Sequence, residues 1–162
     1  MSNTVSLASS SDAGMLEFKE CLKYMRDGHW DEALTYAQRA LENGPQNPFY
    51  LSYTGLLAAL AQNRALNAER LCKEAVAIKH NHAQLYLNLA QVYLQAGRRT
   101  DAIATLEKGL VSTGRDVRIR RELKKLGLRR EPVLSFLERN HPLNRTLGKV
   151  RHRLMGATKT TH

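Results

Sequence analysis

The side chains of this 162-residue chain that could carry out chemistry lie far apart in the sequence. His80 and His82 form its only close histidine pair, and no cysteine stands near them. Because a metal site needs three or four converging ligands, this pair predicts no metal ion. The chain also lacks a glycine-rich phosphate loop, a G-x-S-x-G nucleophile motif and an H-E-x-x-H zinc motif.

Two pairs of acidic residues are the other candidates for chemistry. They are Glu17 with Glu20, and Asp31 with Glu32. Solvated helix faces explain both pairs better than general acid–base catalysis does. We therefore expect no catalytic residue, no cofactor and no enzyme activity.

The two cysteines, Cys21 and Cys72, are not part of a C-x-x-C pair. Both fall on predicted buried helix faces. Reduced core thiols in a cytoplasmic protein are a simpler interpretation than a disulfide.

A recurring spacing of small residues indicates the elements that must position these side chains. Ala33, Ala68 and Ala102 are separated by 35 and 34 residues, and similar residue types surround each of them. Apolar residues at intervals of three, four and seven accompany them, which is the spacing of helices and not of strands. Each copy predicts a helix, a tight turn and a second, antiparallel helix.

Small residues are needed where two helix backbones come closest. Cys21, Gly55 and Ala90 hold that place in the first helices, where a larger side chain would push the hairpin apart. Gly28 and Gly97 close first helices, where a left-handed residue is favoured. Larger residues are expected to fill the gaps: Tyr24, Trp30, Leu41, Leu71, Ile78, Tyr86, Leu89, Tyr93, Ile103, Leu106 and Leu110.

This pattern resembles the tetratricopeptide repeat (TPR) family, whose period is about 34 residues. The resemblance implies an all-α fold of three TPR helix-turn-helix hairpins in a short right-handed solenoid. The hairpins would fill residues 14–112, divided at about 14–47, 48–82 and 83–112. The C-terminal part of the chain forms a basic tail. This tail is similar to the end of some uncharacterised bacterial TPR proteins.

Three features depart from the TPR pattern. Glu17 and Glu20 stand where the first repeat should be apolar, which an end repeat tolerates because it has no predecessor to pack on. His80 replaces the usual proline between repeats two and three. Gly109 replaces the closing small alanine.

The segments that flank the repeats have distinct compositions. Residues 1–13 are serine-rich and predict a disordered arm with no signal peptide. Residues 113–127 predict a capping helix that covers the last repeat. Residues 128–155 predict a basic amphipathic helical tail, and residues 156–162 a disordered C-terminus. No apolar run is long enough for a transmembrane segment.

The net charge of +10 comes entirely from the C-terminal part of the chain. Residues 1–110 carry 11 basic and 11 acidic residues, whereas residues 111–162 carry 14 basic and 4 acidic ones. A basic tail of this kind binds nucleic acid, lies on an anionic membrane surface, or docks onto the chain's own repeats or an acidic partner. The basic residues expected to make this contact are Arg129, Arg130, Arg145, Lys149, Arg151 and Arg153.

In the TPR family, the first helix of each repeat lines a concave groove. Carried over by position, the groove residues are Phe18, Leu22, Met25, Phe49, Tyr53, Leu56, Gln84, Asn88, Gln91 and Gln95. The groove would grade from an apolar, aromatic end to an amide-lined end. Apolar anchors suit a helix or an extended peptide, and amide side chains bond a peptide backbone without requiring a charge.

One branch of the family, the chaperone cofactors, grips a partner's C-terminal carboxylate with Lys, Asn and Arg in this groove. The corresponding positions here are Phe18, Leu22, Tyr53, Gln84 and Asn88. These residues cannot form the same clamp, so the resemblance does not extend to it.

The resemblance and the composition together favour a non-enzymatic protein–protein interaction adaptor or scaffold in the cytoplasm. It would bind a peptide or helix of another protein in the groove, with the basic tail as a second contact. Two alternatives stay open: nucleic-acid or anionic-membrane binding through the tail, and a TPR-type secretion chaperone. The partner and the oligomeric state are left open too.

Overall fold

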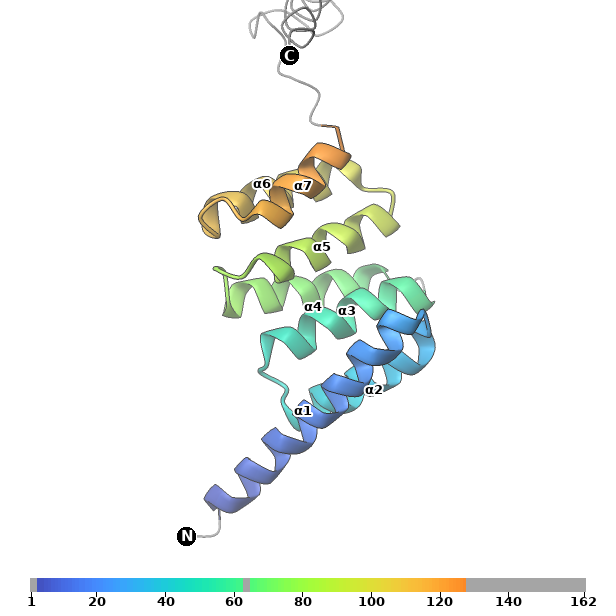
Figure 1. Cartoon of the computed structure of the whole chain (residues 1–162), viewed down its shortest axis with the longest axis vertical. Coiled ribbons are helices and arrows are strands. Elements are labelled where there is room, and N and C mark those ends of the chain that lie inside the picture. The colour runs from blue at the N-terminus through green and yellow to red at the C-terminus, as the bar shows by residue number, and fades with distance from the viewer. Residues whose placement is uncertain (1–2, 63–64, 128–162) are drawn as a thin grey trace, which may run out of the picture. The chain divides into compact units, whose positions relative to one another are not determined.

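A computed structural model describes residues 3–62 and 65–127, with side chains described over 12–61 and 67–127. Within these ranges the chain forms seven α-helices and no strand (Figure 1). The helices are α1 (Asn3–Asp27), α2 (Trp30–Asn43), α3 (Pro48–Gln62), α4 (Ala65–Ile78), α5 (Ala83–Gln95), α6 (Arg99–Ser112) and α7 (Val117–Lys125). The prediction of an all-α fold is confirmed.

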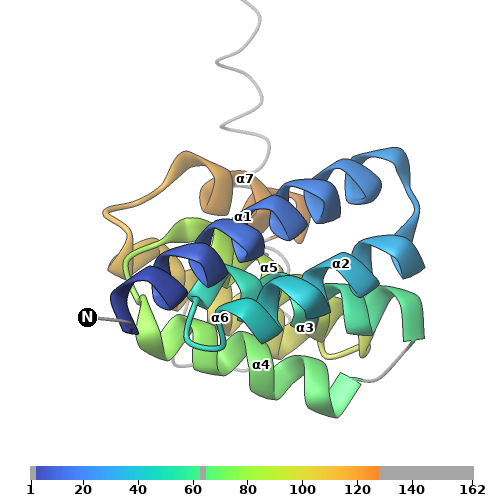
Figure 2. The ribbon, with the colours of Figure 1, turned by 90° about the horizontal axis from the view of Figure 1, so that it is seen from below.

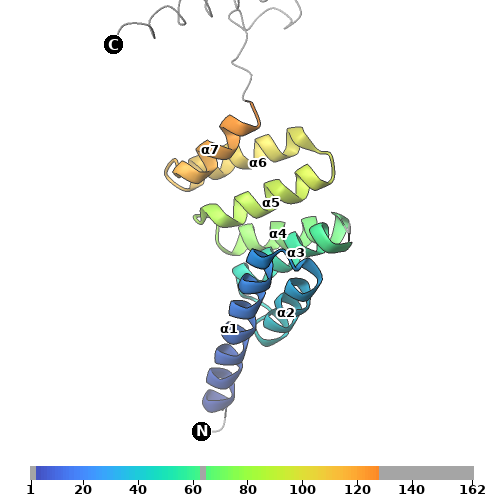
Figure 3. The same cartoon turned by 45° about the vertical axis from the view of Figure 1, so that its right-hand side comes forward.

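The first six helices form three hairpins that stack in chain order. α1 pairs with α2, α3 with α4, and α5 with α6, and α7 then packs on α5 and α6 (Figures 1 and 3). In a view along the stack, α1 and α7 lie on one side and α4 on the opposite side (Figure 2). This is the solenoid of three hairpins and a further helix that the repeat spacing predicted.

The close approach of α3 to α4 explains why the second hairpin has a glycine at its centre. A Cβ atom built on Gly55 would lie 2.7 Å from the backbone oxygen of Ala68 and 2.7 Å from the Cys72 Sγ. Real Cβ atoms essentially never come so close to another atom. The small residues Cys21 and Ala33 are fully buried at the equivalent place in the first hairpin. Small side chains are therefore a steric requirement of the hairpins.

Two glycines end first helices in the left-handed conformation, as expected. Gly28 has a φ of 83° and Gly97 a φ of 72°. In both turns the next residue bonds back to the helix: the His29 N–H donates to the Tyr24 carbonyl at 3.0 Å, and the Arg98 N–H donates to the Tyr93 carbonyl at 2.8 Å.

The structure explains the departure from the repeat pattern at Gly109. A Cβ atom there would lie 2.6 Å from Cγ of Tyr86, so the glycine makes room for this ring. Tyr86 is 1% exposed, and its hydroxyl donates a hydrogen bond to the His80 carbonyl at 2.8 Å. One aromatic side chain therefore joins α6 to the connection before α5.

Both cysteines are buried free thiols, in agreement with the predicted buried faces. Burial raises the pKa of the Cys21 thiol and that of the Cys72 thiol to about 12. The Cys72 thiol also donates to the Ser52 carbonyl at 3.3 Å. These thiols stay protonated at neutral pH and act as small core side chains.

Helix α1 starts earlier than we expected. A disordered arm was predicted over 1–13, whereas the helix begins at Asn3. The segment before Gly14 contains neither proline nor glycine, so nothing in it stops a helix that extends backward from the first repeat. Although α1 has 25 residues, neither it nor any other helix of the described ranges is long and apolar enough to cross a membrane.

Two large apolar residues that were predicted to fill gaps are instead accessible to solvent. Trp30 is 42% exposed and Ile78 is 44% exposed. Trp30 is the first residue of α2 and Ile78 is the last residue of α4. At the end of a helix, a side chain has fewer neighbours to pack on than in its middle. The predicted tail over 128–155 and the predicted C-terminus over 156–162 lie outside the described residues.

An ionic cluster joins the second and third hairpins through α4, α5 and the N-cap residue of α6. The Glu69 carboxylate accepts from Lys73 at 2.7 Å, from Arg98 at 2.6 Å and from the Tyr93 hydroxyl at 3.1 Å. The hydrogen bond from Lys73, followed by those from Tyr93 and Arg98, holds the pKa of Glu69 below its usual value despite the opposing effect of burial. The cluster therefore stabilises the fold through the ionised form of Glu69.

The steric requirement at Gly55 is tested by adding one methyl group. We expect Gly55→Ala to lower the free energy of unfolding by about 1–3 kcal/mol, because overpacking outweighs the better helix propensity of alanine. Urea denaturation measures this difference. The control is Ala104→Gly at an exposed site of α6, where glycine costs about 1 kcal/mol. If Gly55→Ala is as stable as the unaltered chain or more stable, the contact between α3 and α4 does not require a glycine at this position.

The ionic cluster predicts a pH-dependent effect of Glu69→Gln. Since the pKa of Glu69 is lowered in the folded state, its contribution is complete above the unfolded value of about 4.3 and is lost as the pH falls through the folded value. We expect a loss of about 1–3 kcal/mol at pH 7 and a smaller loss at about pH 3. Urea denaturation at both pH values tests this.

A matched control for that experiment is Glu74→Gln. Glu74 pairs with Arg70 at 3.3 Å on the exposed face of the same helix. We expect a change of about 0.5 kcal/mol or less at either pH, because exposed pairs contribute little. Equal effects of the two substitutions would contradict the stabilising role of the cluster.

Candidate binding groove

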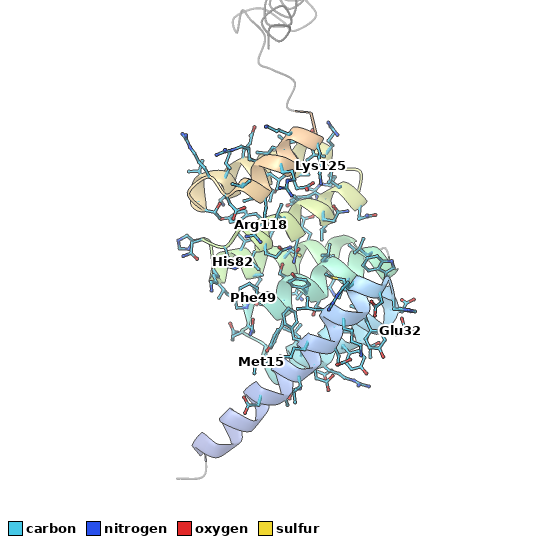
Figure 4. All side chains as sticks on the ribbon, in the orientation of Figure 1. Met15, Glu32, Phe49, His82, Arg118 and Lys125 are labelled. Carbon is cyan, nitrogen blue, oxygen red and sulfur yellow. The ribbon has the colours of Figure 1, made fainter. Side chains whose placement is uncertain are left out.

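The predicted groove residues come from α1, α3 and α5, and a fourth helix continues their line. Met15 on α1, Phe49 on α3, His82 before α5 and Arg118 on α7 follow one another along the stack (Figure 4). The three predicted helices thus present neighbouring stretches of one surface.

The first end of the groove is aromatic. The Phe18 ring centroid lies 5.0 Å from that of Tyr50 and 5.2 Å from that of Tyr53, which it meets edge to face. Phe18 and Met25 are half-buried and pack against the main core cluster. The predicted aromatic end of the groove therefore packs on the core and is partly exposed to solvent.

Phe49 belongs to a different cluster. It packs with Leu51 and Leu85 in the smaller core cluster. Its ring meets the His82 ring edge to face at 4.8 Å, and the Lys79 Nζ lies 5.2 Å from its centre. Phe49 thus contributes to the contact between the second and third hairpins as well as to the surface.

The amide-lined end contains a buried hydrogen-bond chain. Asn88, which is 2% exposed, donates from Nδ2 to the Ser52 Oγ at 3.0 Å. Its Oδ1 accepts from Gln84 Nε2 at 2.9 Å. Both ends of the Asn88 amide are already engaged, so this residue serves to hold α5 against α3.

A cavity of about 400 Å³ opens beside these amides. Leu87, Gln91 and Leu94 of α5 line it, together with Leu56 of α3. Its remaining lining residues are Gln84, Asn88, Ala90, Leu106, Arg118, Arg121, Glu122 and Leu126. The cavity therefore combines leucine side chains with amides, and one wall belongs to α7.

The contribution of α7 was missed by the sequence analysis, which assigned this helix only a covering role. The spacing of the helix starts could have revealed that α7 lines the groove. α3 begins at Pro48, α5 at Ala83 and α7 at Val117, which are steps of 35 and 34 residues. Arg118 and Arg121 thus stand one period after Gln84 and Leu87, so α7 has the position of the first helix of a further repeat.

Helix α7 is held by its own cap and by its apolar side. The Asp116 carboxylate accepts from the Arg118 backbone N–H at 2.8 Å, which makes Asp116 the N-cap residue. Ile119 and Leu123 are buried and attach the helix to the core. Arg118 beside Asp116 holds the pKa of that carboxyl below its usual value.

The ten predicted groove residues differ in accessibility. Leu56 and Asn88 are buried, and Gln95 is exposed and does not line the cavity. The others are half-buried: Phe18, Leu22, Met25, Phe49, Tyr53, Gln84 and Gln91. Four of the ten, Leu56, Gln84, Asn88 and Gln91, converge on the cavity.

The predicted basic contact residues lie outside the described residues. They are Arg129, Arg130, Arg145, Lys149, Arg151 and Arg153. Among the residues that are described, no group of three His, Cys, Asp or Glu side chains has the arrangement of a metal site.

Comparison with known sequences identifies the repeats. Sequence models of the tetratricopeptide repeat match residues 18–49 and 59–124. The TPR repeat-containing thioredoxin TTL4 of Arabidopsis thaliana is 33% identical over 102 residues, which cover 60% of this chain. This chain spans only 15% of the length of that relative.

Solved structures share the fold. The first TPR of Spaghetti (RPAP3), bound to the HSP90 peptide SRMEEVD, has a TM-score of 0.60 at 20% identity and covers 72% of this chain and 94% of its own. The Sgt2 TPR domain of Aspergillus fumigatus has a TM-score of 0.61 at 19% identity and covers 70% of this chain and 76% of its own. At these identities the likeness establishes the fold alone.

The structural role of Asn88 is testable. We expect Asn88→Ala to lower the free energy of unfolding by about 1–3 kcal/mol, because Ser52 and Gln84 lose their partner in a buried place. Gln95→Ala is the control, since it removes an exposed amide from the same helix and should change stability by about 0.5 kcal/mol or less. If thermal or urea unfolding finds the two variants equally stable, the Asn88 amide does not hold the hairpins together.

Proposed function

Because the chain belongs to the tetratricopeptide repeat family, we propose that it is a non-enzymatic adaptor or scaffold that binds a peptide or helix of another protein in its groove. The basic tail would supply a second contact. The observation that carries this proposal is the cavity of about 400 Å³ between α3, α5 and α7, with its leucine and amide lining. Its volume is that of a site for a few side chains.

The chemistry of the lining supports a peptide as the ligand. Leu87 and Leu94 offer apolar contact to a side chain that enters the cavity. Gln91 lies on the same wall, and its amide both donates and accepts hydrogen bonds, as a peptide backbone requires. An extended or helical segment would therefore place an apolar side chain in the cavity and its backbone along the amides.

The structural neighbours support peptide binding as a general property of such a surface. Besides the Spaghetti domain bound to an HSP90 peptide, the second TPR domain of human RPAP3 was solved in complex with the HSP70 peptide SGPTIEEVD. The same peptides are not proposed for this chain. The Lys, Asn and Arg residues of that clamp are replaced here, since its positions hold Phe18, Leu22, Tyr53, Gln84 and Asn88.

The cellular setting that fits this proposal is the cytoplasm. Cys21 and Cys72 are both free thiols in the core. Unpaired buried cysteines are ordinary in a reducing compartment.

The groove proposal predicts that an apolar residue of the cavity wall is needed for peptide binding. Short random peptides would be selected on the full chain, and affinities of the selected peptides measured by fluorescence anisotropy. We expect Leu87→Gln to weaken binding by about tenfold or more, because one apolar contact contributes about 1–3 kcal/mol.

The matched control is Val111→Gln. Val111 is 83% exposed on α6 and does not line the cavity. This variant should bind like the unaltered chain. Failure to select any peptide, or equal affinity of the two variants, would contradict the proposed function and favour an activity that belongs to the tail.

A further inference from the structure

We infer that the α7 end of the groove recognises acidic side chains within a peptide segment, and that Arg118 and Arg121 bind them. This inference rests on the proposed groove function and names the chemistry of its partner. It concerns internal Asp or Glu residues, so the segment need not end in the groove.

The first observation is that one edge of the Arg118 guanidinium is already paired with Asp116. Its Nη2 lies 3.1 Å from Asp116 Oδ2, and its Nε lies 3.3 Å from Asp116 Oδ1. Among the described residues, the remaining terminal nitrogen, Nη1, meets only the Gln84 Oε1, at a long 3.5 Å. One edge of the guanidinium is thus anchored, and the other faces the cavity with a donor that a carboxylate would use better.

The second observation is an excess of positive charge at the same wall. Arg121 lines the cavity one turn after Arg118 and forms no ion pair with an acidic residue of the described part of the chain. The acidic residue beside it, Glu122, is paired with Lys125 at 2.7 Å. A carboxylate from a ligand would therefore meet one guanidinium that Asp116 holds along one edge and one that has no acidic partner among the described residues.

The charge of Arg118 also acts across the groove. It opposes the rise in the pKa of Tyr53 that burial and Cys21 cause. With burial and Lys79, it also keeps the pKa of His82 below its usual value, against the opposing effect of Asp116. The positive potential thus reaches from α7 to α3 and to the connection before α5.

The occupant that fits this wall is an acidic segment with apolar residues, not the chain's own tail. Residues 128–162 carry eight Lys and Arg and only two Asp and Glu, so like charges would meet at α7. A nucleic-acid strand fits less well, because the cavity beside Arg118 and Arg121 is lined by leucines that suit a side chain rather than a phosphate backbone. Apolar residues would lie over the α5 leucines, and acidic residues over α7.

Helix α7 itself offers the matched control. Arg120 and Lys124 lie on the same helix but do not line the cavity. Arg120 donates instead to the Arg115 carbonyl at 3.4 Å. Removing this pair changes the charge of α7 by the same amount as removing Arg118 and Arg121.

The experiment compares R118Q/R121Q with R120Q/K124Q in the full chain. The probes are the tightest peptides selected from a random library on the unaltered chain, amidated at the C-terminus, and the same peptides with Asp and Glu replaced by Asn and Gln. We expect the selected peptides to be enriched in Asp and Glu and to bind at least tenfold more tightly than their amide versions. R118Q/R121Q should lose this preference, whereas R120Q/K124Q should keep it.

Each result of this comparison decides the inference. The inference would be wrong if peptides whose binding requires Leu87 show no enrichment in Asp and Glu, or if both double variants change their affinity equally. In those cases the proposed groove function would still hold. If no selected peptide requires Leu87 for binding, both the inference and the proposed groove function would be wrong. Displacement of the peptide by poly-uridine RNA, in a manner that requires Arg118 and Arg121, would assign the site to phosphate.

Stability is measured in parallel, because R118Q also removes the partner of Asp116. If R118Q/R121Q unfolds, R121Q alone is compared with R120Q, since Arg121 has no acidic partner among the described residues. R118K/R121K keeps the charge and should retain part of the preference. Full affinity of R121Q for the acidic peptides would contradict the inference.

Discussion

The close approach of paired helices is the constraint on which the rest of this structure depends. At Gly55 no side chain fits between α3 and α4, and a buried cysteine and an alanine complete the contact from the other helix. The larger side chains Tyr86 and Leu57 are almost fully buried in the core that these hairpins form, and Tyr86 lies against Gly109 within the third hairpin. The groove is the surface that α1, α3, α5 and α7 form together when these hairpins stack.

The features that follow from local sterics were predictable from the sequence. Alanines about 34 residues apart and glycines after first helices identified the hairpins, because small side chains suit a tight crossing and glycine favours a left-handed turn. The exposure of Trp30 and Ile78 was not predictable, because a periodic pattern does not show where a helix ends. The early start of α1 was missed for a related reason: a serine-rich composition outweighed the absence of any residue that stops a helix.

The candidate site was predictable only in part. Position in the repeat identified the aromatic and amide stretches, and four of those residues do converge on one cavity. The bond between Asn88 and Ser52 depends on how α3 and α5 are rotated against each other, and the sequence separates these residues by 36 positions. Arg118 and Arg121 were overlooked because the period was not extended beyond its last alanine.

The hydrogen bond between Ser52 and Asn88 has a consequence for motion. It joins the second and third hairpins at a buried position, and the Glu69 cluster joins the same hairpins through α4, α5 and Arg98. Separating these hairpins would break both contacts, which favours joint movement of the wall made by Leu56 and the wall made by Gln91. We expect ligands to meet a cavity of nearly constant width, so that selectivity depends more on shape than on adaptation of the protein.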